Sequence, residues 1–321
     1  MIHNLRTITR LDEAETMWRV HIPDETVFDL WEVRAAFHRH YQRPFRFIFG
    51  NPRDDRKLFL PLSWVEEKNA WCFFPGETWA NKTWLEQNRP TFGGLDPKQL
   101  AAELGADFHL RYLKEDPGGS PPLGIDETGY LFHPPKYDYH MDNWWALFSS
   151  KKGKYLRREL RELKERGATV RLGSEKDFDL MVEMSFGRFG AASYFADRRF
   201  RESFRDLLSF LAKMNLLRVT IVCMNTIPAA VDFGSVYRGR YTLLAGGTDG
   251  RFPGVAKLIN LFHLEWACSE KLLEADFLCG DFSWKPLFHL TPRPLYLYTS
   301  LPRITLQTRH RHFLHFRESL R

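Results

Sequence analysis

The chain has 321 residues, of which 44% are hydrophobic and 15% aromatic, and its formal net charge is +6 at pH 7. This composition is typical of a globular protein with one large or two ordinary domains, and it excludes an intrinsically disordered chain. No stretch approaches the roughly 18 uninterrupted apolar residues of a membrane-spanning helix, and residues 1–6 lack the apolar core of a signal peptide.

The cysteines are scattered along the chain and form no C-x-x-C spacing. The four are Cys72, Cys223, Cys268 and Cys279. This pattern indicates buried free thiols in a reducing compartment rather than metal ligands, so we expect no metal. A cytoplasmic enzyme of bacterial type is the simplest interpretation.

The first half is predicted to begin with helices and to continue as a meander of strands. Apolar residues at helical spacing, such as Leu30, Val33 and Phe37, face one way. The expected helices cover residues 11–18, 24–42 and 97–104, and the expected strands cover 45–49, 57–65, 71–74, 107–113 and 130–132. The composition of residues 115–122 predicts a loop.

The second half is predicted to hold three consecutive strands between groups of helices. Short links at Asn225-Thr226 and Arg238-Gly239 join these strands as hairpins. The expected helices are 144–166, 175–188, 197–214, one that begins at 255, and 283–288; the expected strands are 168–172, 216–224, 227–237, 240–247, 275–279 and 294–299.

A glycine-bearing turn connects the strand 240–247 to the helix that begins at Val255. Backbone N–H groups at a helix start have no intrahelical partner, so this geometry accepts phosphate or pyrophosphate oxygens. Pro253 suits the first helical turn, and Gly254 lets a ligand approach the backbone closely. The alternative is an ordinary turn that needs glycine for its dihedral angles.

The order of elements around this turn, with Arg251-x-x-Gly254-x-Ala256 at the helix start, resembles the GNAT acyltransferase superfamily. The superfamily's signature for the acyl-CoA pyrophosphate is Gln/Arg-x-x-Gly-x-Gly/Ala. Two further stretches are similar to the FemAB-like and CelD-like group within it. They are the basic helix start at 149–158, and the strand end 277–281 followed by Lys285.

The resemblance implies an α/β fold of two tandem GNAT-like domains, each a mostly antiparallel mixed sheet flanked by helices. We expect a degenerate domain over residues 1–135 on the acceptor side, and a second domain over 136–321 with the donor loop at 251–256. The corresponding place in the first half, residues 74–79, carries no Arg/Gln-x-x-Gly-x-Ala pattern.

The resemblance also implies acyl-CoA as the donor substrate. The residues expected to hold it are Arg251, Phe252, Gly254, Val255 and Ala256, with Leu244 and Gly246 on the preceding strand. Backbone N–H groups of residues 242–247 could stabilise the oxyanion that forms when an amine attacks the donor carbonyl directly.

Three residues are candidates for proton transfer. Asp281 matches the family's strand-end motif, although it could equally cap the following helix or pair with Lys285. Asp232 lies on the middle hairpin strand, where a carboxylate faces either the acceptor or solvent, and Tyr296 on the last strand could protonate the leaving thiolate. His263 follows an apolar helix face and is predicted to be a packed core histidine.

Positive charge is concentrated in residues 151–166, which contain eight Lys or Arg against three Glu, a local net charge of +5. Lys154, Arg157 and Arg158 lie on one predicted helix face and, with Lys285, form a candidate basic rim for the donor. A solvated helix face is the alternative.

These patterns together predict an N-acyltransferase that moves an acyl or aminoacyl group from a CoA-type thioester to a small-molecule amine. The first alternative is a Fem-type transferase that uses aminoacyl-tRNA and acts on a peptidoglycan precursor; acyl carrier protein is another possible donor carrier. The second alternative is a non-catalytic protein that binds CoA or a nucleotide. No DNA-reading motif accompanies the basic helix, so DNA is not an expected partner.

Overall fold

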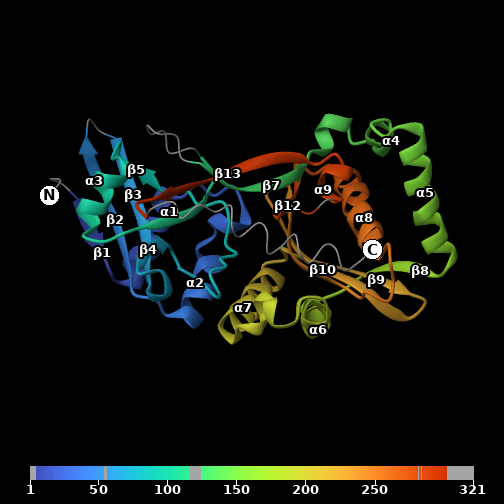
Figure 1. Cartoon of the computed structure of the whole chain (residues 1–321), viewed down its shortest axis with the longest axis horizontal. Coiled ribbons are helices and arrows are strands. Elements are labelled where there is room, and N and C mark those ends of the chain that lie inside the picture. Colours follow the sequence, from blue (N-terminus) through green and yellow to red (C-terminus); the bar gives the residue numbers. More distant parts are fainter. Residues whose placement is uncertain (1–4, 54–55, 116–123, 281, 283, 302–321) are drawn as a thin grey trace.

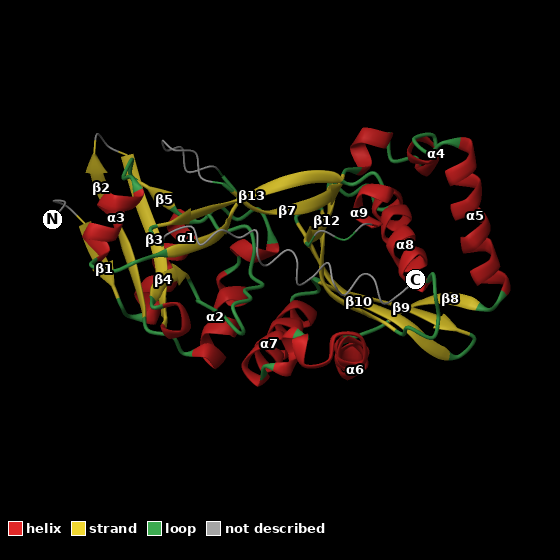
Figure 2. Ribbon diagram, viewed as in Figure 1, coloured by secondary structure: helices red, strands yellow, loops and turns green. Residues whose placement is uncertain are grey.

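The computed structural model describes residues 5–53, 56–115, 124–280, 282 and 284–301. Mixed α/β architecture is its main feature, with two sheets and helices packed on their faces (Figures 1 and 2). In the described part of the chain, no helix is long and apolar enough to cross a membrane.

The first sheet has five strands, in the order β1-β2-β3-β4 with β5 paired to β3. Its strands are β1 (Leu5–Ile8), β2 (Phe45–Arg53), β3 (Arg56–Val65), β4 (Ala70–Phe73) and β5 (Thr91–Phe92). The helices of this half are α1 (Leu11–His21), α2 (Trp31–Tyr41) and α3 (Pro97–Leu104). Strands β1 and β5 lie outside the predicted elements because each is too short to show a pattern.

The second sheet has eight strands, in the order β6-β13-β7-β12-β11-β10-β9-β8. The strands are β6 (His109–Leu113), β7 (Ile125–Phe132), β8 (Ala168–Leu172), β9 (Leu217–Met224), β10 (Ile227–Tyr237), β11 (Arg240–Thr248), β12 (Glu274–Cys279) and β13 (Thr291–Thr299). Its named strands pair antiparallel with their neighbours except β11 and β12, which run parallel.

Helices cover both faces of the eight-stranded sheet, as Figure 2 shows. The helices of this half are α4 (Met141–Trp145), α5 (Ser150–Glu165), α6 (Phe178–Phe189), α7 (Arg198–Lys213), α8 (Val255–Ser269) and α9 (Trp284–Leu287). Helix α8 lies on one face with α5 outside it, whereas α6 and α7 lie on the other face. The hairpins β9–β10 and β10–β11 turn where predicted, at Asn225 and at Arg238-Gly239, which all adopt positive φ.

The single helix expected over 144–166 is split into α4 and α5. Ser149 ends the interruption because its side chain accepts a hydrogen bond from the backbone N–H of Lys152 and so caps α5. Trp144 is fully buried and donates its indole N–H to the carbonyl of Phe288 at 3.0 Å. Burial of this ring fixes α4 at a different angle from α5.

The two halves share strands and core. Strands β6 and β7 precede residue 136 yet belong to the eight-stranded sheet, and β13 pairs with both of them (Figure 1). The hydroxyl of Tyr298 on β13 donates to the carbonyl of Leu95 at 2.6 Å, inside the core of the first half. Sheet pairing therefore crosses the predicted domain boundary between residues 135 and 136. The boundary itself stays a prediction.

Arg34 fastens three segments at the junction of the halves. Its side chain is only 1% exposed and donates to the carbonyls of Phe28 (3.0 Å), Phe74 (3.5 Å) and Glu86 (3.1 Å). Burial lowers the pKa of this guanidinium to about 10, so the group remains charged at neutral pH. Burial of the guanidinium costs desolvation free energy, and removal of the Arg34 side chain leaves the three carbonyls without this donor.

We predict that Arg34→Met lowers the free energy of unfolding by about 3 kcal/mol, because buried carbonyls lose a charged donor. Arg39→Met is the matched control on the same helix, since Arg39 is 66% exposed and pairs only with Asp206 at the surface; its effect should stay below about 1 kcal/mol. Urea unfolding measures both, and equal losses would contradict the role of Arg34.

Candidate active site

The predicted donor loop, residues 249–254, joins β11 to α8. Asp249 builds the turn, because its side chain accepts hydrogen bonds from the backbone N–H and the guanidinium of Arg251. The Arg251 side chain is 74% exposed, whereas Phe252 packs partly against the core under α8 and Val255 is buried in it. The loop thus holds its apolar residues inward and presents Arg251 to solvent.

Gly254 occupies the N-cap of α8 with a φ of +91°, which favours glycine. A Cβ at this position would lie 3.2 Å from both the Glu159 carboxylate and a Leu163 methyl group on α5. Within the described residues, the backbone N–H groups of Gly254 and Ala256 have no hydrogen-bond acceptor. The helix start therefore offers free donors at the exposed end of α8.

Strands β11 and β12 diverge beside this loop. Their parallel pairing covers only Arg240–Thr242 with Glu274–Asp276. Beyond these residues β11 continues along β10, while β12 pairs with β7 at Cys279 and Gly129. The edge of β11 from Leu243 onward therefore has no strand partner on the β12 side among the described residues.

A segment of the first half, residues 84–87, occupies the gap between the diverging strands. The indole N–H of Trp84 donates to the carbonyl of Leu244 on β11 at 3.2 Å. On the other side, the Gln87 amide donates to Asp276 at 2.8 Å, and Glu86 accepts the backbone N–H of Cys279 at 2.8 Å. The segment thereby bonds to both strands.

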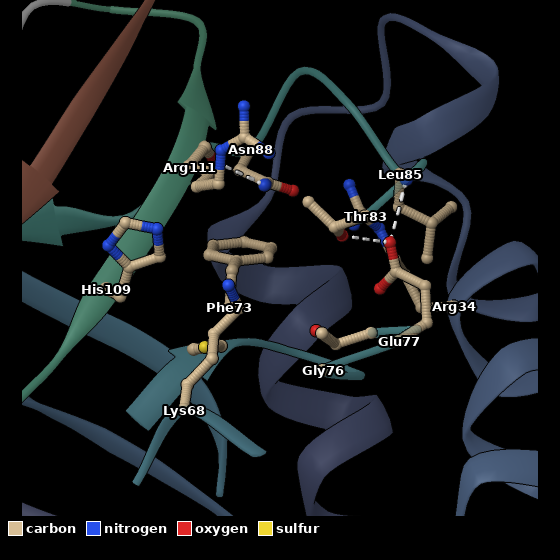
Figure 3. Close-up of a pocket in the computed structure, with 12 residues that line it drawn as sticks. Arg34, Lys68, Phe73, Gly76, Glu77, Thr83, Leu85, Asn88, His109 and Arg111 are labelled. Carbon is tan, nitrogen blue, oxygen red and sulfur yellow. Dashed lines mark hydrogen bonds between the residues drawn. The ribbon is translucent and has the colours of Figure 1, made fainter. Parts of the chain in front are cut away.

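Glu77 fixes this segment from within the first half (Figure 3). Its carboxylate is 3% exposed and accepts hydrogen bonds from the Thr83 hydroxyl (2.5 Å) and from the backbone N–H groups of Trp84 (3.1 Å) and Leu85 (2.8 Å). The adjoining cavity, lined also by Arg34, measures about 20 Å³ and has room for one water. In the first half, the buried carboxylate of Glu77 therefore accepts the hydrogen bonds of these backbone N–H groups.

Lys285 holds the irregular end of β12. Its ammonium group donates to the carbonyls of Phe277 (2.9 Å), Leu278 (2.8 Å) and Cys279 (3.0 Å). Leu278 has a φ of +55°, which turns these carbonyls toward one point. The Lys285 side chain, expected on an exposed rim, is instead only 2% exposed, and burial lowers its pKa to about 8.

Glu86 is a buried carboxylate at the same point, with 5% exposure. Its second carboxylate oxygen, Oε2, has no hydrogen-bond partner in the described structure, and the nearest cation is Arg293 at 3.6 Å. Arg293 is itself bound to Asp276 at 2.6 Å. Burial, with the charge of Asp276 as a smaller cause, raises the pKa of Glu86 from its ordinary 4.5 to about 7.

Asp232 lies elsewhere, under α8. Its carboxylate lies 2.9 Å from the Nε2 atom of His263, and both side chains are buried. The ring of Tyr241 stacks on His263 with centroids 5.0 Å apart. Gly246 pairs across from Asp232, where a Cβ would lie 2.1 Å from the carboxylate. Asp232 therefore belongs to a packed network beneath α8, with Gly246 next to its carboxylate on the neighbouring strand, and His263 is the core histidine that the sequence predicts.

Tyr296, another predicted proton-transfer residue, is not brought to the gap. It is half-buried on β13 and packs against the core of the first half. Asp281 lies outside the described residues. On α5, Lys154, Arg157 and Arg158 are exposed, in keeping with the predicted rim, and Arg157 stacks over the ring of Trp145 at 4.5 Å.

Sequence reasoning did not single out Glu86, Asp276 or Arg293. All three depend on contacts between the halves that no periodicity within one half can reveal. A weak local signal does exist for Glu86, because it follows Trp84 and Leu85 in an irregular stretch. A carboxylate next to two large apolar residues there is a candidate for burial.

Residues 150–286 match the model of a family described as acetyltransferase (GNAT) domain. No curated protein matches the chain significantly. Among solved structures, a conserved protein of unknown function from Bacteroides thetaiotaomicron VPI-5482 is similar, with a TM-score of 0.54 and 14% identity over 93% of this chain and 99% of that one.

FemX is similar with a TM-score of 0.53 and 9% identity, over 94% of this chain and 99% of its own. L-PGS from Bacillus licheniformis has a TM-score of 0.51 and 11% identity, over 87% and 94%. The predicted mixed α/β fold, with mostly antiparallel sheets flanked by helices and a GNAT-like second half, is confirmed. At these identities the likeness shows the fold alone, so membership of the FemAB/CelD-like group is not shown.

We predict that Gly246→Ala destabilises the protein by about 1–3 kcal/mol, because the added methyl group must displace the Asp232 carboxylate. Gly250→Ala is the matched control from the same loop region, since a Cβ there meets nothing within 4 Å. Thermal unfolding compares the two. A Gly246→Ala variant as stable as Gly250→Ala would contradict the packed position of Asp232.

We also predict that Glu86→Gln changes how stability depends on pH. A pKa raised from 4.5 to about 7 means that the folded chain keeps a proton which the unfolded chain releases. The resulting stabilisation is present below pH 4.5 and is lost as the pH rises through about 7, up to about 3 kcal/mol. Urea unfolding at pH 5 and pH 8 should show this loss in the natural protein and not in Glu86→Gln; parallel curves would contradict it.

Proposed function

We propose that this protein is an N-acyltransferase that transfers an acyl group from a CoA-type thioester to an amine. The observation that carries the proposal is the divergence of β11 from β12 beside the glycine-capped start of α8, in the region that matches the GNAT model. The free backbone donors of Gly254 and Ala256 suit the donor's pyrophosphate. The adjacent edge of β11, which has no strand partner on the β12 side among the described residues, gives its thioester arm a strand to lie along.

The donor arm would meet the edge of β11 at Leu244, whose carbonyl already bonds to Trp84 at 3.2 Å. An extended, amide-containing arm can pair with such an unpartnered strand edge in the way that an added strand does. Backbone N–H groups on that edge are the proposed stabilisers of the oxyanion, and each such donor contributes about 100–1000-fold in rate. The segment 84–87 brings the first half to the same place, which suits an acceptor side.

We predict that Arg251→Glu weakens donor binding by at least about tenfold, because a negative charge replaces the exposed cation beside the phosphate donors. The fold should tolerate the change, since Arg251 contacts only the loop's own Asp249 and the ring of its neighbour Phe252. Arg198→Glu on α7, on the opposite face of the sheet, is the matched control. Thermal shift with CoA and acetyl-CoA measures binding, where a ligand at 100 times its Kd stabilises by about 2.7 kcal/mol.

No thermal shift with CoA or acetyl-CoA in the natural protein would refute the CoA proposal. Binding in all variants alike would refute the placement at 251–256. A shift without release of free thiol, across a panel of primary amines, would favour the alternative of a non-catalytic CoA-binding protein.

A second candidate donor, aminoacyl-tRNA, is favoured by the position of α5. Helix α5, which carries the exposed cations of the predicted rim, lies directly beside the start of α8, because Glu159 on α5 pairs with Lys257 on α8 at 2.7 Å. A polyanion longer than CoA could follow these cations beyond the loop. Acyl carrier protein, which carries its own negative charge, would fit the same rim.

We predict that the double change Arg157→Glu and Arg158→Glu abolishes transfer from aminoacyl-tRNA, because tRNA binding requires the exposed cations. Transfer from acetyl-CoA should remain within about threefold of the natural rate, since the loop is unchanged. Arg198→Glu with Lys213→Glu, two exposed cations on α7, is the charge-matched control. Undiminished tRNA-dependent transfer in the α5 double variant would exclude the tRNA donor along this path.

A further inference from the structure

A buried carboxylate of the first half lies where the two strands of the second half diverge. Glu86 contacts β12 through the backbone N–H of Cys279, beyond the last residue of β12 that pairs with β11. Trp84, two residues earlier, bonds to β11 on the other side of the gap. Glu86 is therefore held next to the proposed donor route, on a segment that the first half contributes.

The structure positions Glu86 from several directions. Its backbone carbonyl accepts from Arg34 at 3.1 Å, and the preceding residue, Leu85, donates its backbone N–H to Glu77 at 2.8 Å. The following residue, Gln87, is bound to Asp276. Such fixation on both sides restricts the carboxylate to one place and orientation.

A purely structural role leaves part of this carboxylate unexplained. One oxygen accepts the Cys279 N–H, but Oε2 has no hydrogen-bond partner in the described structure. Arg293 stands 3.6 Å away and directs its closest contact to Asp276 instead. An incompletely paired carboxylate in a buried site costs free energy, so a stability role alone does not account for it.

The charged and titratable groups that face Glu86 come from five elements. They are Asp276 and Cys279 on β12, Arg293 on β13, Lys285 on α9, Glu127 on β7, and Tyr112 on β6, with Tyr194 from the loop before α7. Burial and the neighbouring Glu86 raise the pKa of the Cys279 thiol far above its ordinary value. Cys279 is therefore a protonated thiol and not a nucleophile, which favours direct transfer.

We infer that Glu86 is the general base of the second half's transfer reaction, supplied by the first half, and that the acceptor is a primary amine that arrives as an ammonium ion. This inference rests on the proposed function. The carboxylate takes a proton from R–NH₃⁺, and the neutral amine then attacks the thioester carbonyl. The C–N bond forms, the C–S bond breaks, and the second amine proton leaves with the thiol.

Acidic neighbours support an ammonium substrate. Glu127 is 37% exposed at its side chain and lies beside the buried cluster, where it binds Arg111 at 2.9 Å. Glu127 and Glu86 both act on Cys279 and Lys285, so two carboxylates lie near one point, where they can attract a cation and accept its proton. A carboxyl group whose pKa lies near neutrality can both attract the ammonium ion and accept its proton.

The test compares the natural protein with Glu86→Gln, Glu86→Asp and the control Glu274→Gln, a half-buried carboxylate on β12, the strand that Glu86 contacts. Acetyl-CoA is supplied with a panel of amino acids, amino sugars and polyamines from pH 5.5 to 9, and thiol release is followed. Glu86→Gln should lose about 100–10,000-fold in kcat together with the rise in rate through neutral pH. Glu274→Gln should behave as the natural protein, Glu86→Asp should keep the pH-dependent rise at a lower rate, and CoA-induced thermal shifts should be equal in all four.

Natural kcat and pH profile in Glu86→Gln would overturn the inference while leaving the proposed function intact. If no amine releases thiol and CoA causes no thermal shift, the proposed CoA function fails instead. The pH dependence of unfolding then decides on Glu86 separately. A difference between the natural protein and Glu86→Gln between pH 5 and 8 supports a carboxyl poised to exchange a proton near neutrality, and identical curves overturn it.

Discussion

The divergence of β12 from β11 is the constraint on which the rest of the molecule depends. Strand β12 pairs antiparallel with β7 on one edge from Ala275 to Cys279, with an irregular register, whereas its parallel pairing with β11 on the other edge ends at Asp276. The divergence leaves polar backbone groups without strand partners in the interior. The ammonium group of Lys285 satisfies three of the carbonyls, and a carboxylate from the other half satisfies the N–H of Cys279.

The same divergence explains why the two halves form one structure. A gap between two diverging strands must be filled, and the first half fills it with Trp84, Leu85 and Gln87. Glu77 and Arg34 are buried to hold that filling segment, although each costs desolvation. The charges in the junction are thus a consequence of the sheet topology.

Local patterns were sufficient to predict most of the second half from the sequence. The hairpins turn at Asn225 and at Arg238-Gly239 because Asn225 and Gly239 adopt positive φ readily, and the loop before Val255 forms where the pattern indicated. The strand pattern around Asp232 left open which face its side chain takes, and the structure places it under α8 against His263. Alternation defines two faces but does not say what covers each.

The junction residues could not be predicted in the same way. Glu86 and Asp276 are 190 positions apart in the sequence and meet only because the halves pack together. The expectation of a basic rim at Lys285 depended on its charge, whereas the three carbonyls that surround it arise from the bend at Leu278. Long-range packing of this kind overrides the usual exposure of lysine.

The position of β7 has a consequence for how the molecule can move. This strand stands between β12 and β13, and β13 carries the sheet on to β6 and into the core of the first half. A continuous ladder of hydrogen bonds is stiff against bending between the halves, so a hinge there would have to break strand pairs. The side chain of Trp84 is held by a single hydrogen bond to β11 rather than by a strand ladder, so it can move without breaking strand pairs and while Glu86 stays fixed. Binding and exclusion of water would be coupled through the movement of one side chain rather than of a domain.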